Sequence, residues 1–151
     1  MGFRRVFEIV PLLTVPVLIY VIAASIGAGS RGADVFVREM EGGSIQVTLP
    51  SDAVWWLSAG DLIVLLAIVL LFVELVRGTG ASRYAILHHT AAVFLFLACL
   101  GLFLIADPFA TTTWFLLMVL SALDMIGGVL VHMAAQGGGG GGAGHDPDDD
   151  Y

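Results

Sequence analysis

The stretch VWWLSAGDLIVLLAIVLLFVELV, residues 54–76, carries only two charged side chains, Asp61 and Glu74. An α-helix rises about 1.5 Å per residue, so about 20 apolar residues cross a hydrocarbon core of about 30 Å. This stretch therefore predicts a transmembrane helix.

Three more apolar stretches of similar length lie at about residues 6–26, 84–106 and 112–135. Hydrophobic residues make up 58% of the chain and charged residues 13%, against about 45–50% and about 25% in soluble domains. The sequence thus predicts an all-α membrane protein with four transmembrane helices in an antiparallel bundle. The short link at residues 77–83 predicts that the second and third helices are antiparallel neighbours.

The chain divides into a long helical part and a short tail. Residues 1–136 are predicted to form one four-helix transmembrane domain, because too little sequence remains for a second domain of about 50 residues. Residues 137–151 begin with six glycines and end in AGHDPDDDY. Such a Gly-rich, acidic composition predicts a disordered tail.

The segment VFVREMEGGSIQVTLP, residues 35–50, alternates apolar and polar residues on both sides of Gly42 and Gly43. Alternation around a glycine turn is typical of a β-hairpin. We therefore expect a small extracytoplasmic hairpin at about residues 34–50, between the first two helices. It is either a docking lid for a partner or a solvated connector packed on the bundle.

Arginines predict the orientation of the chain. Arg4 and Arg5 precede the first apolar stretch, and Arg77 and Arg83 flank the link between the second and third. The positive-inside rule places these regions, and both termini, in the cytoplasm. The first stretch also fits a secretory signal, whose removal would leave three spans; we interpret it as an uncleaved anchor.

Interface markers stand at the ends of the predicted helices. Trp55, Trp56 and Trp114 are expected at headgroup level, where amphipathic rings are enriched. Asp61, three residues after Ser58, suits a helix cap because an acid complements the helix dipole.

Asp124 lies near the middle of the fourth apolar stretch, where a charged side chain is costly. Ser121, Gly127 and Gly128 fall on the same helical face and predict close helix packing. Asp124 is therefore either a proton or ion relay or the donor of an interhelical hydrogen bond that fixes packing.

A second polar group is predicted near the cytoplasmic side: Glu74, His88, His89 and His132. Histidine titrates near neutral pH and binds metals and haem iron. The group is a proton-exchange pair, a metal or haem site, or a set of interfacial side chains. We predict no metal and no cofactor, and Cys99 is the only cysteine, which excludes an internal disulfide and a thiolate metal cage.

The succession WWLSAGDLIVLLAIVLLFVE, LHHTAAVFLFLACLGLFLI and TTTWFLLMVLSALDMIGG resembles a group of small four-span membrane proteins of alphaproteobacteria. The likeness covers about residues 54–128 and implies four spans in a bacterial inner membrane, but no activity. It nominates the following positions: Trp56, Gly60, Asp61, Glu74, His88 or His89, Thr113, Asp124 and Gly128.

The composition argues against some classes of function. Six arginines against 13 acidic residues argue against nucleic-acid binding, and no nucleophile–base motif predicts an enzyme. The leading hypothesis is a non-enzymatic protein of the lipid bilayer that acts through helix contacts, as a homo-oligomer or as an accessory or structural subunit of a membrane complex. The alternatives are a proton- or ion-coupled channel or transporter subunit that uses Asp124, and a haem or quinone electron carrier.

Overall fold

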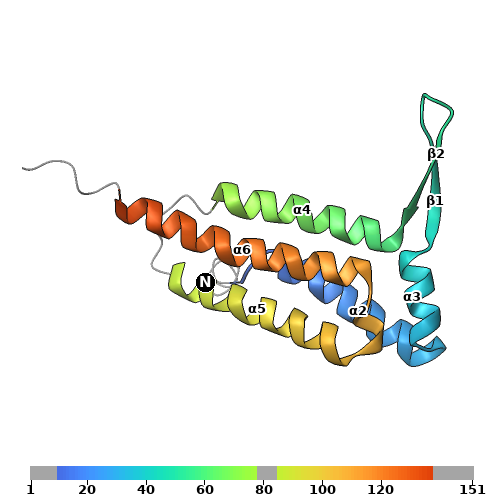
Figure 1. Cartoon of the computed structure of the whole chain (residues 1–151), viewed down its shortest axis with the longest axis horizontal. Helices are drawn as coiled ribbons and strands as arrows, with labels where there is room; N and C mark the ends of the chain where they lie inside the picture. Colours follow the sequence, from blue (N-terminus) through green and yellow to red (C-terminus); the bar gives the residue numbers. More distant parts are fainter. Residues whose placement is uncertain (1–9, 78–84, 138–151) are drawn as a thin grey trace, which may run out of the picture.

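A computed structural model describes residues 10–77 and 85–137 of the chain (Figure 1). Helices dominate the described part, and the only sheet there is a two-stranded antiparallel hairpin. The elements are α2 (Thr14–Arg31), α3 (Ala33–Glu41), β1 (Gly43–Thr48), β2 (Val54–Ser58), α4 (Ala59–Arg77), α5 (Ala85–Ile105), the 3₁₀ turn η1 (Asp107–Phe109) and α6 (Thr112–Gly137).

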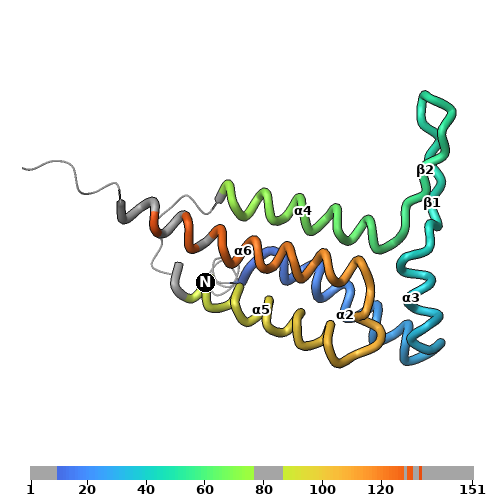
Figure 2. Tube along the Cα trace, viewed as in Figure 1, coloured from blue at the N-terminus to red at the C-terminus, as the bar shows by residue number. Residues whose placement is uncertain are grey.

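Helix α6 is the central helix of the fold. It packs mainly against α5 and α4 and also contacts α2 and α3. Helices α2 and α5 run in one direction and α4 and α6 in the other (Figure 1). The trace in Figure 2 shows α6 between α4 and α5. The expectation that the second and third apolar helices are direct neighbours is therefore wrong, because α6 separates them.

Three helices are long and apolar enough to cross a membrane: Thr14–Arg31, Ala59–Val76 and Leu87–Ile105. Helix α6 contributes a shorter apolar segment, Thr112–Gly127, among the side chains that the structure describes. Large apolar side chains such as Leu65, Phe94 and Leu104 are more than half exposed. Such an apolar outer surface fits a lipid environment. In water, exposed apolar patches of this size would favour aggregation of the protein.

The predicted helix boundaries hold best for α5 and α6, which differ from the expected ranges 84–106 and 112–135 by at most two residues. Helix α2 begins at Thr14 rather than near residue 6 and extends to Arg31. Pro16 then lies in the first helical turn, where its missing N–H breaks no intrahelical hydrogen bond. Gly137, the first residue of the predicted tail at 137–151, belongs to α6. The rest of that tail and most of the link at 77–83 lie outside the described residues.

The predicted position of the hairpin is wrong. Residues 33–41 form α3, and Gly42 joins this helix to β1 instead of making the turn. Phe36 and Met40, one helical turn apart, are both buried, and the Phe36 ring meets the Tyr20 ring edge-on at 5.7 Å. Burial of this i, i+4 pair favours the helix over the alternating pattern that suggested a strand.

The hairpin instead pairs β1 with β2, so Trp55 and Trp56 belong to a strand and not to the start of a transmembrane helix. Helix α4 starts at Ala59. The Ser58 hydroxyl accepts the Asp61 N–H at 3.0 Å, and the Asp61 carboxylate accepts the Ser58 N–H at 2.8 Å. This reciprocal pair is a capping box, which explains why the helix begins where it does.

Replacing the cap should weaken the fold measurably. Ser58→Ala is expected to lower the free energy of unfolding by about 1 kcal/mol, because the Asp61 N–H loses its acceptor. Thermal unfolding in detergent, followed by circular dichroism, measures the change. Ser25→Ala is the control, since the exposed Ser25 hydroxyl only donates to Val21 O in its own helix. Equal losses in the two variants would show that the cap contributes nothing.

Candidate functional site

Glu74, near the end of α4, is the centre of a polar cluster. Its two carboxylate oxygens accept the backbone N–H of Leu12 at 3.0 and 3.1 Å. Its Oε1 also lies 2.7 Å from Nε2 of His88 on α5. The side chains of Glu74 and His88 are 10% and 29% exposed, so this acid–imidazole pair is largely shielded and links α4 to α5.

Asp124, on α6, is the third ionisable member of the cluster. It is 5% exposed, and its Oδ2 is buried without a hydrogen-bond partner among the described residues. Glu74 and His88 both interact electrostatically with it. A buried carboxyl oxygen without a partner is costly in an apolar interior. Among the described residues, Asp124 is thus one of two buried side chains with an unpaired polar atom, and the other is His89.

The three groups lie at similar depth. Helices α4 and α6 begin at the same end of the molecule (Figure 1). At about 1.5 Å per residue, Glu74 lies about 22 Å along α4 and Asp124 about 18 Å along α6. Glu74 therefore lies close to the end of α4 opposite the hairpin, whereas Asp124 lies at about the middle of the longer α6.

The structure brings together only part of the predicted polar group. His88 pairs with Glu74, whereas His89 has a buried Nδ1 with no partner among the described residues. Adjacent residues point about 100° apart on a helix, so both histidines cannot face Glu74. The side chain of His132 lies outside the described part. Within that part, no three His, Cys, Asp or Glu side chains gather as metal ligands.

The small-residue face of α6 is turned inward. Ser121 is 1% exposed, donates to Leu117 O at 2.9 Å and lies against the Cys99 thiol of α5. A Cβ on Gly127 would lie 3.1 Å from Leu75 Cδ2 of α4. These small residues let α6 approach both neighbours closely. Gly128 continues the helix, but its surroundings lie outside the described part.

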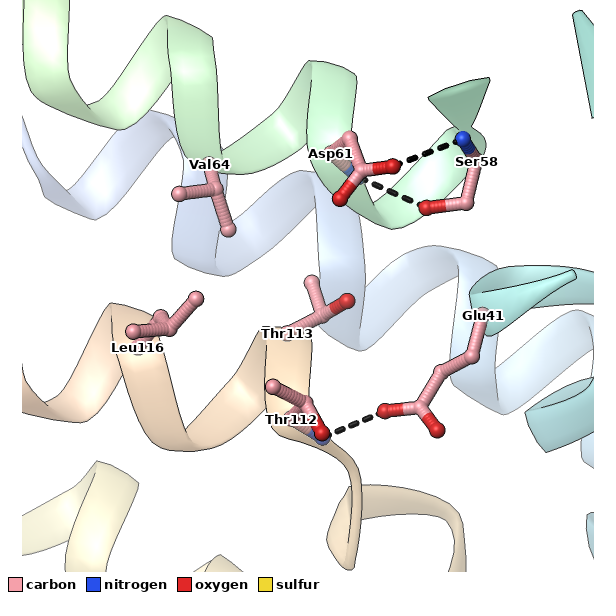
Figure 3. Close-up of a pocket in the computed structure, with 7 residues that line it drawn as sticks. All are labelled: Glu41, Ser58, Asp61, Val64, Thr112, Thr113 and Leu116. Atoms are coloured by element: carbon pink, nitrogen blue, oxygen red, sulfur yellow. Dashed lines mark hydrogen bonds between the residues drawn. The ribbon is translucent and has the colours of Figure 1, made fainter. Parts of the chain in front are cut away.

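A pocket of about 250 Å³ lies at the hairpin end of the helices (Figure 3). Its polar groups already serve the ends of two helices: Glu41 Oε1 accepts the Thr112 N–H at the start of α6, and Asp61 caps α4. The pocket is therefore best explained as the joint between α3, α4 and α6. Its lining residues are Glu41, Ser58, Asp61, Val64, Thr112, Thr113 and Leu116.

Trp114, which the sequence predicted at headgroup level, has no exposed ring. It is fully buried, and its Nε1 donates to Cys99 O at 2.9 Å. Its ring packs on Tyr20, whose hydroxyl donates to Pro108 O at 3.0 Å and shares a 2.6 Å hydrogen bond with Thr111 Oγ1. Sequence reasoning missed Tyr20, although a phenol in an apolar helix was a signal that a buried partner was needed.

The chemistry open to the cluster is proton exchange. An imidazole and two carboxyl groups can each gain or lose a proton, and the groups act on one another through a low-dielectric interior. Comparison with known proteins adds no function: no protein-family model, no curated protein and no solved structure matches this chain.

Proposed function

We propose that the chain is a multi-pass protein of the bacterial inner membrane, in which α2, α4, α5 and α6 cross the bilayer as a four-helix bundle. The apolar lengths of α2, α4 and α5 support this, as does the 26-residue length of α6. The arginines at positions 4, 5, 77 and 83 support cytoplasmic termini. Glu74 and His88 then lie on the cytoplasmic side of the membrane centre, and Asp124 lies near the centre.

Within this bundle, we propose that Asp124, Glu74 and His88 form a proton-binding site of a proton-coupled channel or transporter subunit. The observation that carries the proposal is the buried Asp124 Oδ2, which has no partner among the described residues, beside the Glu74–His88 pair. A carboxyl retained only for packing would be expected to have its hydrogen bonds satisfied. One such carboxyl per chain does not make a continuous proton path across the membrane, so a conducting form would require several copies of the chain.

The structure gives less support to the other two hypotheses. One argument for an accessory or structural subunit was the small-residue face of α6, but Ser121 and Gly127 use this face for packing inside the chain. The haem hypothesis used His132 with His88 or His89; Nε2 of His88 is engaged with Glu74, and the side chain of His132 lies outside the described part.

Proton flux into liposomes tests the proposal. The purified chain is reconstituted with a pH-sensitive dye inside the vesicles, and a potassium diffusion potential drives proton entry. Asp124→Asn is expected to reduce flux to that of protein-free vesicles, because the amide keeps the shape of the side chain but cannot release a proton. The flux of the wild type should clearly exceed this background.

Ser121→Ala is the matched control, because Ser121 lies about one turn before Asp124 on the same buried face. It should conduct like the wild type, and both variants should elute like the wild type in gel filtration. Full flux through Asp124→Asn, together with loss of folding in Asp124→Ala, would refute the proton-binding role and establish a packing role.

A further inference from the structure

The β1–β2 hairpin, residues 43–58, has two unlike faces. Cross-strand partners share a face, and the register pairs Ile45 with Leu57 and Val47 with Trp55. These four side chains form one wholly apolar face, which we call the arm face. The opposite face is mixed, because Gln46 pairs with Trp56 and Thr48 with Val54.

The arm face is largely unpartnered. Ile45 is 45% exposed, Val47 39% and Trp55 55%. A two-stranded hairpin is only marginally stable in water by itself. An apolar face of this kind at the tip of a small protein therefore indicates a surface that another phase or molecule covers.

The direction of the hairpin indicates which surface its apolar face can contact. The hairpin joins the N-terminal end of α4 and lies roughly perpendicular to the long helices. It extends past α4, away from α5 and α6 (Figure 1). If the helix axes follow the membrane normal, the hairpin runs parallel to the membrane plane. It then overhangs the region beside α4, a helix with exposed leucines such as Leu62, Leu65 and Leu66 that lipid would cover.

The composition of the hairpin fits the interface between headgroups and acyl chains. Tryptophan and aliphatic side chains are favoured at this depth. The only charged residue from Gly43 to Ser58 is Asp52, in the turn. Since the hairpin has no lysine or arginine, binding needs no anionic lipid.

We propose that the hairpin is a membrane-surface arm: the arm face inserts into the interface of the extracytoplasmic leaflet, and the face with Gln46 and Trp56 remains toward water. This inference rests on the membrane crossing proposed above, but not on the proton-binding role. The arm would fix the height and tilt of α4 in the bilayer, since β2 continues directly into that helix.

Tryptophan fluorescence of the full chain in phosphatidylcholine nanodiscs tests the arm. Trp56→Phe leaves Trp55 as the reporter, and Trp55→Phe leaves Trp56, while the buried Trp114 is the same background in both. Lipids brominated near the headgroup end of the acyl chain should quench Trp55 several-fold more than Trp56. Iodide in the aqueous phase should quench Trp56 more than Trp55.

A third variant separates the arm from the membrane crossing itself. Leu65→Trp, combined with Trp55→Phe and Trp56→Phe, places a reporter on the exposed side of α4. The arm would be refuted, and the membrane crossing retained, if deeply brominated lipid quenched the Leu65→Trp reporter while Trp55 in the Trp56→Phe variant was quenched by iodide but not by brominated lipid. No bromine quenching of either reporter would overturn both.

Discussion

Trp114→Ala is expected to lower the free energy of unfolding by about 3–5 kcal/mol, the range for removing a large buried aromatic side chain. The Trp114 side chain is fully buried where α2, η1 and α6 meet. Its ring centroid lies 4.6 Å from that of Phe109 and 5.0 Å from that of Tyr20. The substitution leaves a cavity among rings that cannot all move inward, and it removes the donor to Cys99 O.

Thermal unfolding in detergent measures this loss, with Trp55→Ala as the matched control. Trp55 is the same residue type but 55% exposed on the hairpin, so its removal should change the free energy of unfolding in detergent by no more than about 0.5 kcal/mol. If the two variants lost equal stability, the aromatic contacts of Trp114 would not hold α2 against α6.

The apolar helices could be predicted because the length of an apolar stretch is enough to identify such a helix in a chain of this composition. The hairpin could not be placed, because residues 35–41 satisfy both a strand pattern and a helix pattern. Only the burial of Phe36 and Met40 against α2 and its neighbours decides between them. The same tertiary packing decides where α4 begins, since Trp55 and Trp56 are apolar enough to continue the helix.

The members of the polar cluster could be named from the sequence, but their pairing could not. Glu74, His88 and Asp124 stand out as ionisable groups within apolar helices, and topology brings them to similar depth. Nothing in the sequence shows that His88 rather than His89 faces Glu74, because that depends on the rotation of α5 about its axis. Nor does it show that the backbone N–H of Leu12 binds Glu74.

Gly60→Ala is expected to lower the free energy of unfolding by about 1–3 kcal/mol, the range for overpacking a close contact. A methyl group at Gly60 would overlap the Thr113 hydroxyl of α6 and lie 3.0 Å from Met40 O at the end of α3. Three elements therefore meet at this glycine, and one of them must move to accept a side chain. Thermal unfolding in detergent again measures the loss.

Gly101→Ala provides the contrast. Gly101 is also helical, but a Cβ there would meet no heavy atom within 4 Å beyond its chain neighbours and the nearby backbone of its own helix. The same substitution at Gly101 should therefore stabilise the chain, by at most about 1 kcal/mol, because alanine is the better helix former. Equal losses at Gly60 and Gly101 would show that crowding is not the cause.

A double-mutant cycle identifies which neighbour resists the new methyl group. Thr113→Ala removes the hydroxyl that the methyl would overlap, so Gly60→Ala should cost about 1 kcal/mol less in that background. An unchanged cost would assign the conflict to Met40 O, which is backbone and cannot rotate away. In that case the spacing of α3 and α4, rather than that of α4 and α6, requires a glycine at position 60.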